Sequence, residues 1–257
     1  MNRITQLFEN KKNSVLSVYF TAGYPHHADT IPILEALEMN GIDMAEIGIP
    51  FSDPMADGLV IQHSAEEALR NGMSLRLLFE QLKEVRRTIQ MPLILMGYLN
   101  PIMQYGFNHF CQSCAEAGID GMIIPDLPFA DYLANYQSVA GQYGLKMIML
   151  ITPETSGERI RLIDRHTEGF IYMVSSASTT GAQQQFDESK QAYFKKVAGM
   201  KLRNPLMVGF GISNKATLEA ATAHTNGAIV GSKFIQLLGE QPTPDEAVKG
   251  LLEALQT

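Results

Sequence analysis

Short apolar runs rich in β-branched residues recur along the whole chain, and segments with helical periodicity separate them. One such segment carries Leu75, Leu78, Leu82, Val85 and Ile89, which fall on one face of a helix. Strict alternation of strand and helix implies parallel strands, and eight repeats favour a closed (β/α)8 barrel of the TIM class over an open sheet. The predicted strands are 15–22, 44–49, 93–98, 121–125, 146–151, 170–174, 206–210 and 228–231.

The main alternative is a doubly wound open sheet. No G-x-G-x-x-G follows the first predicted strand, which argues against a dinucleotide-binding sheet of that kind. The length of 257 residues is usual for one barrel domain, and no low-complexity linker divides the chain. We therefore expect a single domain over 1–257. Two connections, 50 to about 64 and 175 to about 188, are long, and both follow a strand, so they belong to the face where barrel active sites lie.

Composition excludes several classes of function. A net charge of −7 argues against a nucleic-acid partner. The chain has no run of about 18 apolar residues that would predict a membrane span. Residues 1–13 lack the apolar core of a signal peptide, so we expect a cytoplasmic protein. The six histidines show no H-x-x-x-H or HExxH pattern, and we expect no metal.

The two cysteines, Cys111 and Cys114, form a C-x-x-C. That spacing is found in zinc sites and in redox pairs. A second Cys/His pair at zinc spacing is absent, and the motif lies within a helical pattern, so we interpret both as ordinary helix cysteines.

The second predicted strand contains an acidic residue, Glu46. Because side chains alternate along a strand, Ala45 and Ile47 should face the outer helices, while Glu46 points into the barrel with Met44. A carboxyl group in such a place has a raised pKa and is suited to acid–base catalysis. A glutamate facing solvent at the strand end, or a buried ion pair, would fit the same position.

The next residues, 51–58, contain Asp53, Pro54, Asp57 and Gly58. This composition is typical of an ordinary turn. The loop nevertheless brings two carboxylates within eleven residues of Glu46, and paired carboxylates in one cleft can divide acid and base roles.

Glycines mark the ends of the last predicted strands, with Gly209 and Gly211 after the seventh and Gly231 before Ser232 after the eighth. Gly181 lies in the loop after the sixth. Barrels often bind phosphate with the loops after strands seven and eight, where glycine lets backbone amides approach the oxygens. Glycines that only shape turns would look the same in the sequence.

Residues 46–58, Glu-Ile-Gly-Ile-Pro-Phe-Ser-Asp-Pro-Met-Ala-Asp-Gly, resemble the signature of the tryptophan synthase α subunit family. The resemblance extends over essentially the whole chain, through segments 19–25, 96–101, 125–128 and 209–213. It implies cleavage of indole-3-glycerol phosphate to indole and glyceraldehyde 3-phosphate, with Glu46 and Asp57 as catalytic carboxylates. Glu46 would transfer both protons, and Asp57 would accept the indole N–H.

The resemblance also implies the binding residues. An apolar indole pocket is expected from Tyr19, Met96, Tyr98, Ile123, Leu150 and Tyr172. Phosphate is expected on amides near Gly181, Phe210, Gly211, Gly231 and Ser232, with no lysine or arginine required. Thr180 is expected to pair with Asp57 when the loop after strand six closes.

Family members work with a β subunit that holds pyridoxal phosphate and receives indole through a tunnel, in an α2β2 heterotetramer. The resemblance places Asp53, Pro54 and Asn100 on the surface that faces this partner. This chain itself is expected to carry no cofactor and to be weakly active alone, because the partner orders the long loops and so couples the two sites allosterically.

Two positions depart from the family pattern. Leu59 follows Asp57-Gly58 where many relatives have proline, and residues 175–181 read Ser-Ser-Ala-Ser-Thr-Thr-Gly where many have an arginine or a Val-Thr-Gly ending. Two other readings remain open, namely a barrel aldolase or isomerase for another phosphorylated substrate, and a non-catalytic chain that only activates a β partner.

Overall fold

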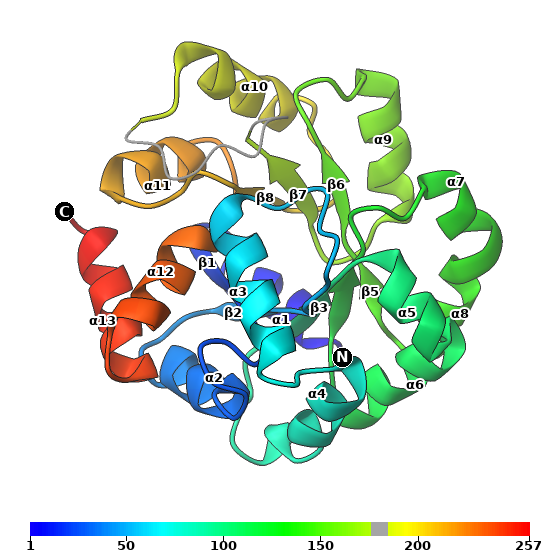
Figure 1. Ribbon diagram of the computed structural model, residues 1–257. Helices are drawn as coiled ribbons and strands as arrows, with labels where there is room; N and C mark the ends of the chain where they lie inside the picture. The colour runs from blue at the N-terminus through cyan, green and yellow to red at the C-terminus, as the bar shows by residue number, and fades with distance from the viewer. Residues whose placement is uncertain (176–184) are drawn as a thin grey trace.

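The computed structural model describes residues 1–175 and 185–257, and its strands form a nearly closed parallel barrel (Figure 1). The hydrogen-bonded order is β5-β4-β3-β2-β1-β9-β8-β7-β6. The two ends of this order are neighbours in the chain, so the sheet curls round on itself, as the alternation predicted. The strands are β1 (Val15–Thr21), β2 (Met44–Gly48), β3 (Leu93–Met96), β4 (Gly121–Ile123), β5 (Lys146–Met147), β6 (Met149–Ile151), β7 (Ile171–Val174), β8 (Leu206–Gly209) and β9 (Gly227–Val230).

The fifth predicted strand, 146–151, is wrong as a single element, because it divides into β5 and β6 at Ile148. β5 pairs with β4, whereas β6 pairs with β7. The Ile148 amide still donates to the Met122 carbonyl of β4, at 3.0 Å, and its side chain is buried. The strand therefore breaks where the chain changes partner, and this is where the barrel closes.

Helices surround the strands in a ring (Figure 1). They are α1 (Arg3–Asn10), α2 (Thr30–Met39), α3 (Leu59–Arg70), α4 (Leu75–Leu82), α5 (Leu99–Tyr105), α6 (Phe107–Ala117), α7 (Phe129–Asp131), α8 (Gln137–Gln142), α9 (Gly157–His166), α10 (Glu188–Ala198), α11 (Lys215–Thr222), α12 (Ser232–Glu240) and α13 (Pro244–Ala254), with a 3-10 turn at Val85–Arg87 and a π-helical turn at Tyr132–Tyr136.

Most predicted strand ends differ from the structure by only one or two residues, and two helical boundaries differ by more. The loop after β2 ends at Gly58 rather than near residue 64, because α3 begins at Leu59. Leu59 is 82 % exposed, so it interrupts the apolar periodicity that would have marked the helix. The stripe from Leu75 to Ile89 is wholly buried as predicted, but its helix ends at Leu82 and a 3-10 turn carries the last part.

Apolar side chains form two clusters, one on each face of the barrel wall. The larger cluster lies between strands and helices and includes Ala45 and Ile47, whereas the smaller fills the barrel interior and includes Met44 and Ile94. Adjacent residues of β2 therefore face opposite sides, as the alternation predicted. No helix in the described ranges is both long and apolar enough to cross a membrane.

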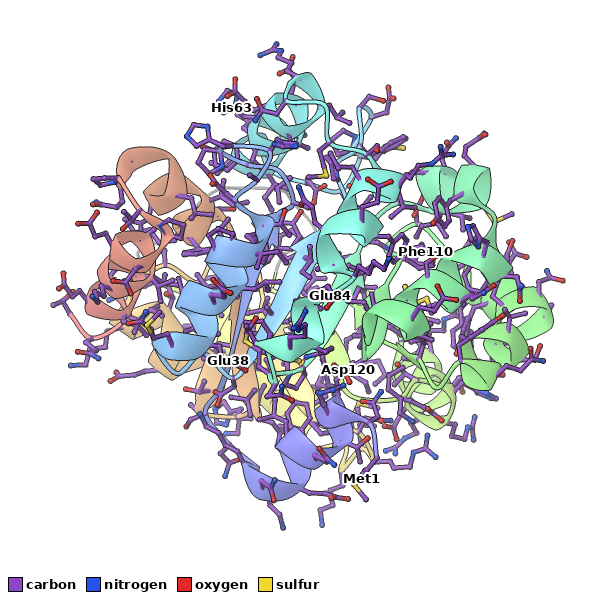
Figure 2. The ribbon with its side chains drawn as sticks, turned by 90° about the horizontal axis from the view of Figure 1, so that it is seen from below. Met1, Glu38, His63, Glu84, Phe110 and Asp120 are labelled. Carbon is purple, nitrogen blue, oxygen red and sulfur yellow. The ribbon has the colours of Figure 1, made fainter. Side chains whose placement is uncertain are left out.

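The first helix covers one end of the barrel. In the side-on view of Figure 2, α1 lies at the end near Asp120, and His63 on α3 lies at the opposite end. Ile4 and Phe8 of α1 enter the interior cluster, where the Phe8 and Phe170 ring centroids are 6.1 Å apart. This helix is not predicted from the sequence, because it presents only a short apolar patch.

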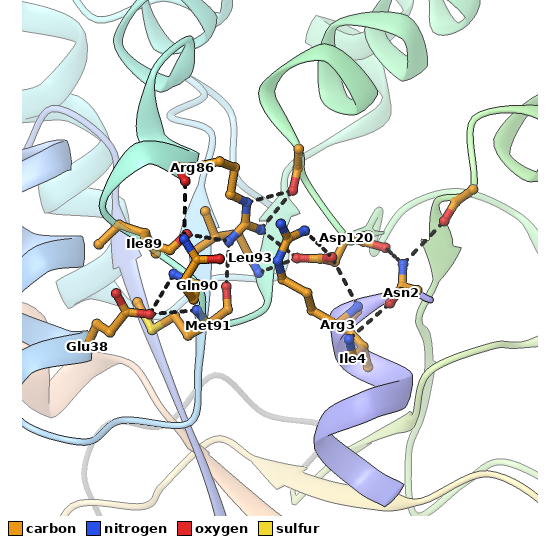
Figure 3. A network of polar contacts seen from close by, with 12 residues as sticks. Asn2, Arg3, Ile4, Glu38, Arg86, Ile89, Gln90, Met91, Leu93 and Asp120 are labelled. Atoms are coloured by element: carbon orange, nitrogen blue, oxygen red, sulfur yellow. Dashed lines mark hydrogen bonds and ion pairs between the residues drawn. The ribbon is translucent and has the colours of Figure 1, made fainter. Parts of the chain in front are cut away.

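The carboxylate of Asp120 holds this end together (Figure 3). It accepts from Arg86 Nη2 at 2.6 Å, from Arg3 Nη1 at 3.3 Å and from the Leu93 amide at 3.0 Å. The Asp120 side chain is 4 % exposed and that of Arg86 is 17 % exposed. Buried charges of this kind are tolerated only when every partner is present.

Replacing Asp120 by Ala should therefore lower the free energy of unfolding by roughly 3–5 kcal/mol, because it leaves the Arg86 guanidinium without its counter-ion. Urea unfolding followed by circular dichroism measures the change. The matched control is Glu84→Ala, which breaks the exposed pair with Arg87 and should change the free energy by less than about 1 kcal/mol. Equal effects of the two substitutions would contradict this assignment.

Candidate active site

A cavity of about 240 Å³ lies at the carboxyl ends of the strands, between the barrel mouth and the start of α3. Its wall comes from β1, β3, β7 and β9 and from the turns after β8 and β9. The lining residues are Tyr19, Asp57, Gly58, Leu59, Val60, Ile61, Met96, Tyr172, Phe210, Gly211, Ile212, Ile229, Gly231, Ser232 and Lys233.

Eight of the residues predicted for the site share this cavity. They are Tyr19, Asp57, Met96, Tyr172, Phe210, Gly211, Gly231 and Ser232. Others lie elsewhere: Ile123 is fully buried in the interior cluster, and Leu150 borders a separate cleft between the β4 and β6 loops. Thr180 and Gly181 lie outside the described residues.

Glu46 is fully buried in the barrel interior, behind the cavity lining rather than in it. Its Oε1 accepts a hydrogen bond from the Ser17 hydroxyl of β1 at 3.0 Å. Over the ranges that the structure describes, its Oε2 is buried without a hydrogen-bond partner. Burial raises the pKa of Glu46 to about 8, although the Ser17 hydrogen bond opposes that rise. Glu46 is therefore mostly a neutral acid at pH 7.

Asp57 lies at the cavity edge, at the end of the loop that joins β2 to α3. Its Oδ2 accepts from the Tyr98 hydroxyl at 2.9 Å, and its backbone carbonyl accepts from Gln62 at 2.7 Å. Burial raises the pKa of Asp57, and the hydrogen bond from Tyr98 counteracts that rise. Tyr98 thus contacts the carboxylate from behind instead of lining the cavity as predicted.

Two tyrosines of the cavity lining, Tyr19 and Tyr172, lie close enough to both carboxyl groups to feel their charges. The pKa of the Tyr172 hydroxyl is raised, first by burial and then by the charges of Glu46 and Asp57. Burial and the same two carboxyl groups also raise the pKa of Tyr19. Both carboxyl groups therefore influence the same two hydroxyl groups inside the barrel.

Glycine makes room for these phenols. An added Cβ at Gly48 would overlap the Tyr19 hydroxyl, and one at Gly209 would overlap the Tyr172 hydroxyl. No larger residue fits either position while the ring stays in place. The width of the cavity wall thus depends on two glycines that do not line it.

The turns after β8 and β9 form another part of the cavity wall. Phe210 and Gly211 have φ values of +69° and +79°, a left-handed pair that is strained for phenylalanine. Gly231 precedes α12, a helix of nine residues whose first turn has no side-chain cap. The N-terminus of α12 therefore lies at the cavity, with Gly231, Ser232 and Lys233 in the lining, and a helix N-terminus suits a bound anion.

Sequence reasoning missed several residues of the site. Ser17 could have been found, because it lies two residues before Tyr19 on the same face of β1. Lys233 also lines the cavity, although no basic residue was required. Ile61 and Ile229 supply apolar wall, and no local motif distinguishes them from core residues.

The residues predicted to face a partner lie at the surface. Asp53 and Asn100 are exposed and Pro54 is half-buried. Two apolar side chains of the same region, Met55 and Leu59, are 92 % and 82 % exposed.

Cys111 and Cys114 are free and buried on α6, as the helical pattern predicted. Burial raises the pKa of the Cys111 thiol to about 12, so it remains protonated and unreactive. Within 1–175 and 185–257, no three acidic, histidine or cysteine side chains gather in the way a metal ion needs.

Comparison with known proteins identifies the family of the chain. Residues 5–256 match the family model described as tryptophan synthase alpha chain. The tryptophan synthase alpha chain of Parabacteroides distasonis is 70 % identical, with 99 % of each chain covered, and that of Bacteroides thetaiotaomicron is 62 % identical, with 99 % of this chain and 100 % of the relative covered.

Solved structures give the same result. Tryptophan synthase subunit alpha from Legionella pneumophila superposes with a TM-score of 0.89 at 36 % identity, covering 100 % of this chain and 97 % of that one. A chain of the tryptophan synthase complex from Pyrococcus furiosus superposes with a TM-score of 0.84 at 34 % identity, covering 95 % and 98 %. In sequence and in fold, this chain belongs to the tryptophan synthase alpha chain family.

Proposed function

We propose that this chain cleaves indole-3-glycerol phosphate to indole and glyceraldehyde 3-phosphate, with Glu46 and Asp57 as the catalytic carboxyl groups. The chain is a lyase of tryptophan biosynthesis, as its family is. The observation that carries the assignment is a buried glutamic acid, one oxygen of which has no hydrogen-bond partner among the described residues, beside an apolar cavity that Asp57 borders.

The bond that breaks joins C3 of the indole ring to the first carbon of the glycerol chain. Glu46 first gives its proton to C3, which places a positive charge on the indole nitrogen. The Glu46 carboxylate then takes the proton of the adjacent hydroxyl. The oxygen electrons form the aldehyde, the electron pair of the broken bond returns to the ring, and Glu46 regains its acid form.

The environment of Glu46 suits this order of steps. A pKa of about 8 keeps the acid form populated at neutral pH, and the unpaired Oε2 is free to exchange the proton. Because Glu46 lies behind the lining, its side chain has to rotate toward the cavity when substrate binds.

Asp57 serves as a fixed negative charge. As a carboxylate it accepts the indole N–H and stabilises the positive charge that develops on the nitrogen. The phosphate group binds at the opposite side, on the amides near Phe210, Gly211 and Gly231 and on the Ser232 hydroxyl. Lys233 adds a positive charge at the same edge.

The exposed loop around Asp53 and Pro54, together with Asn100, is the surface for a β subunit. The Pyrococcus furiosus relative was solved as a tryptophan synthase complex, which supports such a partner. The partner would hold pyridoxal phosphate, receive indole directly through a tunnel and form an α2β2 heterotetramer in the cytoplasm. Met55 and Leu59 add apolar area to this surface, which favours burial against another chain. Thr180 and Gly181, outside the described residues, would complete the closed site.

Glu46→Gln should lower turnover by about 1000-fold or more, because the amide can neither donate nor regain the proton. Asp57→Asn should lower it by about 100- to 1000-fold through loss of the stabilising charge. Indole release measures turnover, and calorimetry with a non-cleavable indole-alkyl phosphate should show nearly unchanged binding. Full turnover in Glu46→Gln would remove this residue from the mechanism.

The raised pKa of Glu46 also predicts how stability depends on pH. Between pH 4.5 and about 8 the folded protein keeps a proton that the unfolded chain releases, so the free energy of unfolding falls as pH rises. The slope is at most about 1.4 kcal/mol per pH unit. Glu46→Gln lacks this pH-dependent component, so the free energy of unfolding of the variant should rise relative to that of the parent between pH 5 and 8. Urea unfolding across that range tests it, with Glu84→Gln as the exposed control; a constant difference would refute the buried acid.

A β subunit should bind this chain and raise its indole release, because the contact orders the loops over the cavity. Sedimentation of a mixture gives the stoichiometry, and the pyridoxal phosphate absorbance follows the partner into the complex. Asp53→Lys on the exposed loop should weaken the complex and leave the isolated activity unchanged. Absence of both binding and activation would contradict the partner assignment.

A further inference from the structure

Tyr98 occupies a place in the site that its predicted role does not explain. It follows β3 at the start of α5, is buried, and does not line the cavity. Its ring packs against Phe51 with centroids 5.4 Å apart. A residue that served only as apolar wall would not direct its hydroxyl into the neighbouring loop.

The Tyr98 hydroxyl connects two consecutive residues of the β2–α3 loop. It accepts a hydrogen bond from the Ala56 amide at 2.9 Å and donates one to Asp57 Oδ2, also at 2.9 Å. Because the acceptor site is occupied by Ala56, the hydroxyl proton is directed to the carboxylate. The bond therefore has one orientation, and it is strengthened by the charge of Asp57.

Asp57 is consequently held from two sides. Gln62 on α3 binds its backbone carbonyl, and Tyr98 binds its carboxylate. Among the described residues, Oδ1 has no hydrogen-bond partner, and it is not a fully buried atom. Tyr98 thus occupies one oxygen and leaves the other available at the cavity edge.

Tyr98 itself has little freedom. The preceding Gly97 packs so closely on the end of β2 that an added Cβ would lie 2.9 Å from Ile49 Cβ. The following amide, of Leu99, donates to Asp126 Oδ1 at 2.8 Å. Two neighbouring strand ends, those of β2 and β4, therefore fix the point from which the phenol reaches Asp57.

We propose that Tyr98 is the positioning residue for Asp57: its hydroxyl ties the carboxylate to the loop backbone and aims Oδ1 at the indole nitrogen of the substrate. This inference rests on the function proposed above. It assigns to Tyr98 a role in orienting charge rather than in forming the apolar pocket. A loop otherwise open to solvent thereby presents a carboxylate in one orientation before substrate arrives.

The pH profile of activity depends on the titratable groups around Asp57. They are Tyr98 on the α5 side, Tyr19 on β1, Glu46 on β2 and Tyr172 on β7, with Lys233 across the cavity. Tyr98 is the group whose hydrogen bond lowers the pKa of Asp57. Since Asp57 acts as a carboxylate, activity falls as pH drops through its pKa. Removing the hydroxyl raises that pKa and moves the acid limb to higher pH.

The test is Tyr98→Phe, which keeps the ring against Phe51 and removes only the hydroxyl. We expect kcat to fall by about 10- to 100-fold, as for loss of a hydrogen bond to a charged group, while KM changes by less than about threefold. The acid limb of kcat/KM should move to higher pH. The matched control is Tyr143→Phe, whose hydroxyl lies on the surface beside Asn108, and it should leave both values unchanged.

A second variant tests the same bond in the opposite direction. Replacing Tyr98 by 3-fluorotyrosine, a stronger hydrogen-bond donor of nearly the same shape, should move the acid limb to lower pH. Opposite shifts in the two variants cannot arise from a general loss of packing. Thermal unfolding of each variant shows whether the fold is kept.

Combination with Asp57→Asn separates this inference from the function on which it rests. If Tyr98 acts through Asp57, Tyr98→Phe has little further effect once Asp57 is replaced. If Asp57→Asn abolishes turnover while Tyr98→Phe leaves kcat and the pH profile unchanged, the positioning role alone is overturned. No loss from Asp57→Asn would overturn the proposed function itself. Independent, multiplying losses from the two substitutions would also overturn the positioning role.

Discussion

A carboxyl group inside the barrel is the constraint around which this site is arranged. Glu46 has no solvent contact, and among the residues that the structure describes its side chain has one hydrogen-bond partner, Ser17. In such a place the neutral form is favoured, because an ion would lack both water and a counter-charge. The surrounding phenols and the interior apolar cluster maintain that condition. The fold thus keeps a weak acid protonated at the pH of the cell, and burying this polar group lowers the stability of the protein.

The two carboxyl groups differ because their surroundings differ. Glu46 is enclosed by the barrel, whereas Asp57 lies at its edge and receives a hydrogen bond from Tyr98. The first environment favours the acid and the second favours the anion. The same functional group at two depths therefore exists as an acid in one place and as an anion in the other, the two forms that the proposed roles use.

Much of the fold could be read from the chain because alternation and periodicity are local. The inward direction of Glu46 follows from the period of two along β2, and the buried stripe from Leu75 to Ile89 follows from helical spacing. The break at Ile148 could not be read, since it depends on which neighbour each half of the strand finds at closure. The start of α3 was hidden because exposed Leu59 interrupts the pattern.

The residues of the site could also be predicted in part from the sequence. Residues on strands and glycine turns came together at one mouth, whereas Tyr98, Ile123 and Leu150 did not join the lining. Where a side chain reaches across a loop, as Tyr98 does to Asp57, its direction is set by several segments at once. Sequence spacing carries no information about such a contact. Eight of the residues that the family resemblance named meet at this mouth, whereas the Tyr98 hydroxyl is directed to Asp57.

The contact of Asn2 and Arg3 with Asp120 has a bearing on how the protein is made. These residues lie 117 or 118 positions apart, so the first helix leaves the ribosome long before its anchor is synthesised. Until then Ile4 and Phe8 have no barrel interior to enter. The apolar face of the first helix is therefore exposed on the nascent chain. The helix can dock only when the first half of the barrel has emerged.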